Sequence, residues 1–273
     1  MLNFESHMGV PCKKNKDDGD SLLWAGLMHF SYEDKNSRFL PGILKSQDET
    51  TGAFYRAPSR VPDRNSPPNS TKNSFSRDMS VGLLAAVATE VNEKEKKITR
   101  AAQKWMNFVA KNKGLTCNDA EDTRGKTTPS VYWIASYVGL KVPLIYRLTR
   151  FLLPIYLNLV SISAPKGYPC HLIAVMCMIF QRVVGHSALI QGAINNLHHR
   201  ETSNLFFEFL SGKDISKKLL LLEKEVIKNN QGKMSQWTWE RSDSEMAYLD
   251  SMGWDFIFLK TLNEKRILNK LVG

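Results

Sequence analysis

The segment that most constrains the fold is residues 170–184, which are apolar on most sides of a helix. Gly167 and Pro169 mark the start of this helix, and Gly185 marks its end. A helix without a continuous polar face is normally central in a protein. We therefore expect residues 170–184 to lie at the centre of the molecule, with other helices around them.

Apolar residues recur at helical spacing through most of the remaining chain. Nothing in the sequence predicts a parallel βαβ series or a glycine-rich phosphate loop. Short connections between the patterns favour antiparallel helix pairs. The sequence therefore predicts an all-α fold, with helices at about residues 21–30, 76–91, 98–113, 129–138, 142–160 (interrupted near Pro154), 170–184, 187–198, 204–210, 215–228, 242–249 and 256–271.

At 273 residues, the chain fits one large domain or two small ones. We expect a flexible lead-in at residues 1–16 and a single helical domain at 17–273, with a long loop at 31–73. Loops of this length are often functional or disordered. Residues 52–60 contain aromatic side chains and arginines, which favours docking on the domain, whereas residues 63–72 are expected to be mobile.

The formal net charge is +10, from 37 Lys and Arg against 27 Asp and Glu. Because these cations are spread over several helices without a run of five or six like charges, we interpret them as a solvated basic surface. Nucleic-acid binding stays a weaker alternative, since only residues 54–60 combine aromatic and basic side chains. Such binding would weaken steeply with added salt.

Two apolar stretches, residues 151–164 and 171–180, are shorter than the roughly 18–20 residues that span a bilayer, so we interpret both as buried helices without a membrane span. The N-terminus lacks the apolar core of a secretory signal. The four cysteines show no CxxC spacing, which favours reduced thiols and argues against a zinc site. These features predict a cytoplasmic protein without a metal or a cofactor.

Candidate functional residues lie at helix junctions. Asp20 either caps the first helix or acts as an acid or base. Arg77 and Asp78 begin a helix, where the dipole favours a carboxylate but not an arginine, so the pair is either a substrate clamp or a structural ion pair. A second group of candidates either forms an aromatic platform with polar groups that bind a sugar ring, or is a buried tryptophan with a structural ion pair. It consists of Trp239, Glu240, Arg241, Trp254 and Asp255, and Arg56 and Arg60 from the long loop are further candidates for substrate binding.

The histidines are less informative, because histidine at a helix end is explained by the helix dipole. The sequence has no GxSxG motif and no Ser-His-Asp order, which argues against a serine hydrolase.

Three stretches together resemble the inner-helix junctions of (α/α) toroid proteins, a superfamily that includes inverting glycosidases and polysaccharide lyases. They are Asp18-Gly19-Asp20-Ser21-Leu22-Leu23-Trp24-Ala25-Gly26-Leu27, Ser76-Arg77-Asp78-Met79 and Trp237-Thr238-Trp239-Glu240-Arg241. The resemblance covers most of the chain as architecture and implies a toroid, complete or incomplete, with a sugar-binding cleft of acids and aromatics at one end. The chain is short for a complete toroid of six helix pairs.

Two functions from different classes follow. The first is a carbohydrate-active enzyme that acts on an oligosaccharide or polysaccharide. We expect Asp20 and Glu240 to be its acid and base, in either order, with Asp78 as the alternate. Arg56 and Arg77 orient the substrate, and Trp239 stacks on a sugar ring. The second is a non-catalytic helical binding or assembly protein, such as a phage or bacterial accessory protein. Facing carboxylates without a neutralising arginine favour the enzyme, and carboxylates that are all paired with arginines favour the binding protein.

Overall fold

The computed structural model describes residues 6–11, 20–32, 38–61, 75–93, 96–116, 125–228 and 254–272. These residues are mostly helical, which confirms the predicted all-α class. The elements in chain order are β1 (Ser6–His7), β2 (Val10–Pro11), α1 (Ser21–Tyr32), α2 (Leu40–Lys45), the 3-10 helix η2 (Pro58–Arg60), α3 (Arg77–Thr89), α4 (Lys97–Lys111), α5 (Pro129–Tyr137), α6 (Leu144–Leu148), α7 (Leu152–Ser163), α8 (Tyr168–Val184), α9 (Ala188–Arg200), α10 (Leu205–Leu210), α11 (Ser216–Lys228) and α13 (Trp254–Val272). β1 and β2 form an antiparallel pair.

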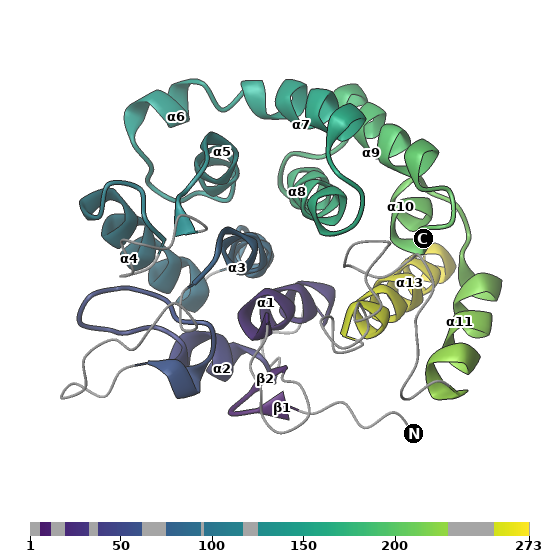
Figure 1. The fold of residues 1–273 in the computed structure, drawn as a ribbon, viewed down its shortest axis with the longest axis horizontal. Coiled ribbons are helices and arrows are strands. Elements are labelled where there is room, and N and C mark those ends of the chain that lie inside the picture. The colour runs from purple at the N-terminus through teal and green to yellow at the C-terminus, as the bar shows by residue number, and fades with distance from the viewer. Residues whose placement is uncertain are drawn as a thin grey trace.

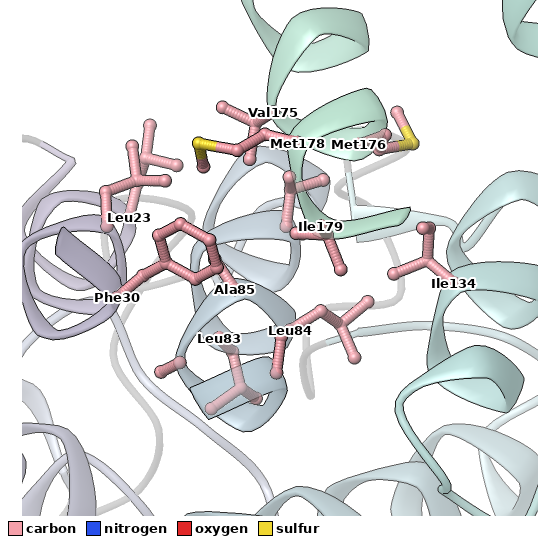
Figure 2. Close-up of a cluster of buried hydrophobic side chains, with 14 of the residues drawn as sticks. Leu23, Phe30, Leu83, Leu84, Ala85, Ile134, Val175, Met176, Met178 and Ile179 are labelled. Carbon is pink, nitrogen blue, oxygen red and sulfur yellow. The ribbon is translucent and has the colours of Figure 1, made fainter. Parts of the chain in front are cut away.

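Helix α8 lies in the interior of the molecule, as the sequence predicts (Figure 1). It packs against α3, α5, α7 and α9. Figure 2 shows how α1, α3, α5 and α8 direct apolar side chains into one cluster, with Leu23 and Phe30 from α1 and Ile179 from α8. Burial of these chains, at roughly 1.5–3 kcal/mol each, is the main force that holds the four helices together.

The described helices alternate along the chain between buried and peripheral positions. Helices α1, α3 and α10 are buried along nearly their whole length. Helices α4, α7 and α9 bury one face only, and Figure 1 shows α4, α6, α7, α9 and α11 along the outer edge. Helix α13 returns to pack against α1, so the first and the last of the described α-helices are in contact.

His171 and Asn204 connect α8 to α10 inside the core. The Asn204 side-chain oxygen accepts hydrogen bonds from the backbone N–H groups of Phe206 and Phe207, which caps α10. This fixes the amide so that its Nδ2 donates to His171 Nε2 at 3.0 Å, while His171 Nδ1 donates to the carbonyl of Gly167 at 3.0 Å. The buried histidine therefore has a structural role as a neutral ring.

The prediction that residues 151–164 are buried is wrong for one face of α7. Phe151, Ile155, Leu159 and Ile162 are exposed, whereas Leu153 and Leu157 face the core. A strongly apolar composition does not by itself show that a helix is covered on all sides. Among the described residues, no helix is both long enough and apolar enough to cross a membrane.

Helix α2 lies within the segment for which the sequence pattern predicts a long loop. Pro41 and Gly42 are typical of turns, but Pro41 lies in the first turn of α2, where a backbone N–H has no intrahelical partner to lose. Gly42 lies against Gly9, where a Cβ atom would be 2.3 Å from the Gly9 carbonyl oxygen. Residues 33–37 and 62–74 lie outside the described residues, and the second range includes the whole stretch at 63–72 that is predicted to be mobile.

Candidate functional site

Two carboxylates, Asp20 and Asp78, lie at the starts of α1 and α3. The two helices cross in direct backbone contact, because a Cβ atom at Gly26 would be 2.0 Å from the Gly82 carbonyl oxygen. Asp20 precedes Gly26 by about 9 Å of helix and Asp78 precedes Gly82 by about 6 Å. This crossing holds the two acids close enough for the charge of Asp20 to raise the pKa of Asp78.

Arg56 reaches this pair of acids from the loop segment that precedes η2. Its guanidinium Nη1 lies 3.6 Å from Asp20 Oδ1, and both side chains are partly buried. The segment is held by Gln47, whose amide donates hydrogen bonds to the carbonyls of Gly52 and Ala101, and by Phe54, which is buried. These contacts confirm that residues 52–60 are docked, and they fix the backbone from which Arg56 extends.

The carboxyl group of Asp78 has its pKa raised to about 6. Burial is the largest cause and the negative charge of Asp20 is the second, while Arg77 and Arg56 act in the opposite direction. Among the described residues, no hydrogen bond or ion pair to the Asp78 side chain offsets its burial. The pKa of Asp78 is therefore raised from that of an ordinary carboxyl group toward neutral pH.

Asp78 and Arg77 line a hollow of about 410 Å³ between α3, α5, α7 and α8. Its polar lining comes from Thr128, Ser130 and Ser163, and the ring of Tyr156 lies on the α7 side. The hydroxyls of Thr128 and Ser130 are 2.9 Å apart and hydrogen-bonded to each other. Asp20 and Arg56 do not belong to this lining, so Asp78 is the residue that joins the acid pair to the hollow.

The other candidates lie elsewhere. Arg60 is exposed at the end of η2 and does not line the hollow. Trp254 is fully buried at the start of α13, edge-on to Phe39 with ring centroids 5.7 Å apart, and Asp255 beside it is buried. Trp239, Glu240 and Arg241 lie outside the described residues. The structure thus brings together Asp20, Arg56, Arg77 and Asp78, and separates Trp254 from the open surface.

Sequence reasoning missed the residues of α5 and α7 that line the hollow. Thr128 and Ser130 flank Pro129 at the start of a helix, where a polar side chain reads as an ordinary cap. Tyr156 and Ser163 lie in a stretch whose apolar composition predicts a core helix. Only the packing of α7 against α8 places these side chains opposite Asp78.

No group of three or more metal-ligating side chains lies together in the part of the chain that the structure describes. Comparison of the chain with protein-family models, with curated proteins and with solved structures finds no match.

Proposed function

We propose that this chain is a carbohydrate-active enzyme, of the glycoside hydrolase or polysaccharide lyase type, that works with Asp78 and Asp20. The observation that carries the proposal is the Asp78 carboxyl group, which has a pKa of about 6 and faces a hollow beside a second acid. A general acid works best when its pKa lies near the working pH. Two neighbouring carboxylates in different environments are the usual source of such an acid and its partner.

In this mechanism, protonated Asp78 donates its proton to the glycosidic oxygen as the bond to the anomeric carbon breaks. A carboxylate base accepts a proton from the water that attacks the anomeric carbon. Asp20, which carries Arg56 at 3.6 Å and does not itself line the hollow, takes this role where the bound sugar extends past Asp78 toward the start of α1. This inverting reaction needs a separation of roughly 6.5–9.5 Å between the two carboxyl groups. Glu240 stays a candidate for the base, and Arg77 and Tyr156 are suited to hold the sugar in the hollow.

An (α/α) toroid, complete or incomplete, is part of the same proposal. The alternation of buried and peripheral helices supports it. So does the succession of contacts from α1 to α3, α5, α8 and α10, continued by Phe206 of α10 against Phe258 of α13 at 5.7 Å and by the return of α13 to α1. The acids lie at the N-terminal ends of α1 and α3, which are two of the inner helices.

The test is a panel of neutral and uronate-containing polysaccharides, read out by new reducing ends for hydrolysis and by unsaturated sugars for elimination. Asp78→Asn is expected to reduce the rate by about 10²–10⁴-fold, the usual contribution of a general acid. Glu49→Gln, which changes an exposed carboxylate in a turn away from the hollow, is the matched control and keeps the rate. Full activity of Asp78→Asn on a cleaved substrate would contradict the assignment.

The alternative is a non-catalytic binding or assembly protein. The ion pair between Arg56 and Asp20 favours it, because a carboxylate neutralised by an arginine is also what a structural junction contains. This alternative predicts that a glycan, or another ligand of the hollow, binds without being cleaved. Isothermal titration against the same panel, followed by analysis of the recovered glycan, distinguishes the two functions.

A further inference from the structure

The outer face of α6 and α7 carries a continuous line of exposed apolar side chains. They follow one another at intervals of three or four residues, which is helical spacing within α6 and within α7, and Phe151 lies in the turn that joins the two helices. Each is between 42% and 63% exposed. The line, called here the α6–α7 stripe, consists of Leu144, Leu148, Phe151, Ile155, Leu159 and Ile162.

Monomeric proteins rarely expose contiguous apolar patches larger than a few hundred Å², and larger patches mark contact surfaces. The opposite face of α7 packs on the core through Leu153 and Leu157, so core packing does not explain the stripe. Figure 1 shows α6 and α7 along the outer edge of the molecule, where a broad surface can reach them.

The segment that carries the stripe has an unusual charge. Residues 125–200 contain seven Lys and Arg and no Asp or Glu, so this segment contributes +7 to the net charge of +10. Lys141, Arg147 and Arg150 are exposed on and beside α6, and Lys166 is exposed just after α7. The apolar stripe therefore has cations at both ends, on and beside α6 and just after α7, whereas α7 itself carries none.

We propose that the α6–α7 stripe docks on an anionic lipid bilayer, with α6 and α7 lying in the plane of the membrane surface. An apolar helix face flanked by Lys and Arg enters the boundary between headgroups and acyl chains, and its cations contact lipid phosphates. A second copy of the chain is a poorer partner, because pairing two stripes brings two cationic borders together. The proposal does not depend on the sugar-directed function.

The first measurement is co-sedimentation of the full chain with vesicles of phosphatidylcholine alone and of phosphatidylcholine with phosphatidylserine. Binding is expected only to the vesicles that contain phosphatidylserine, and it is expected to weaken as salt screens the charges. Equal binding to both kinds of vesicle, or binding to neither, overturns the proposal. If the chain binds neither and instead forms dimers in sedimentation velocity, a second copy covers the stripe.

The apolar part of the stripe is tested with the double variant Phe151→Ser/Leu159→Ser. It is expected to weaken binding to the anionic vesicles at least tenfold, since each buried methylene contributes about 0.8 kcal/mol. The matched control is Leu220→Ser/Leu221→Ser, which changes two leucines of α11 that are 61% and 64% exposed. Equal binding by the two double variants overturns the proposal, and thermal unfolding checks that both are folded.

The cations are tested with Lys141→Gln/Arg147→Gln. Each Lys or Arg near an anionic surface contributes about 1 kcal/mol to binding. The double variant is therefore expected to bind the anionic vesicles roughly twentyfold or more weakly, and its binding should depend less on salt. The control is Lys45→Gln/Lys104→Gln, which removes two exposed cations from α2 and α4. An equal loss in both variants would mean that total charge, and not the α6–α7 stripe, causes the binding, and would overturn the proposal.

Discussion

At the scale of single residues, Asp78 links the candidate site to the stability of the fold. Its pKa of about 6 lies above the usual 3.8, so the folded state binds more protons than the unfolded state between these two pH values. Stability that is present at low pH is therefore lost as pH rises through about 6. The helix dipole favours the carboxylate by only about 0.3–1 kcal/mol, too little to offset this loss.

Asp78→Asn is accordingly expected to stabilise the protein at about pH 8, by about 1–3 kcal/mol, and to have little effect at about pH 4. The measurement is denaturant unfolding at both pH values. Asp20→Asn is a second variant that removes the like charge, so the pKa of Asp78 should fall in a carboxyl NMR titration. Loss of stability at pH 8 in Asp78→Asn would mean that this carboxylate makes structural contacts.

Asn204 caps α10 and also hydrogen-bonds His171 in the core, so replacing it should reduce the stability of the fold by more than the loss of an ordinary helix cap does. Asn204→Ala removes the cap of α10 and leaves His171 Nε2 without its donor. The expected loss is about 2–4 kcal/mol, from about 1 kcal/mol for the cap and about 1–3 kcal/mol for the buried polar atom. Ser76→Ala, which removes the hydroxyl cap of α3, should cost only about 1 kcal/mol. Equal losses in the two variants would contradict the structural role of His171.

At the scale of elements, the crossing of α1 and α3 depends on two glycines. Gly26→Ala places a methyl group within 2.0 Å of the Gly82 carbonyl, so the helices must separate. We expect destabilisation of about 3 kcal/mol or more, at the upper end for overpacking. Gly192→Ala on α9 is the control, because its new Cβ meets only the flexible side-chain amide of Asn158. Unfolding curves that show similar stability for both variants would argue against the close crossing.

The sequence predicts elements well where local signals are strong. Ser76 caps α3, Pro129 begins α5, and Gly114 and Gly139 end α4 and α5 with positive φ. The sequence does not predict features that depend on contacts between residues far apart in the chain. The N-terminus of α4 is capped by the Glu90 carboxylate, which accepts hydrogen bonds from the backbone of Ile98 and Thr99, and no local motif indicates this.

At the scale of the whole molecule, convergence of Asp20, Arg56, Arg77 and Asp78 follows from their positions at helix starts and in a docked aromatic segment, which the sequence does indicate. The hollow does not follow in this way, because α5, α7 and α8 meet around it only in three dimensions. The outward face of α7 is unpredictable for the same reason. Its apolar residues suit a core, and only the neighbours α8 and α9 decide which of them are covered.

The packing of α13 on α1 predicts that the described helices unfold as one unit. Trp254, Phe256, Phe258 and Leu259 are each at most 2% exposed, and α1 is buried partly beneath them. Ending the chain before residue 254 would expose both surfaces, at about 1.5–3 kcal/mol for each large side chain, which is comparable to the whole stability of a domain.

The truncated chain should therefore bind hydrophobic dyes and lose its sharp thermal transition, whereas Trp254→Phe, which keeps an aromatic ring at the α1 contact, should retain one transition at a lower temperature. Far-ultraviolet circular dichroism and tryptophan fluorescence should give coincident curves for the intact chain. A sharp transition in the truncated chain would show instead that α13 is an appendage, and that the helices before it close their core without it.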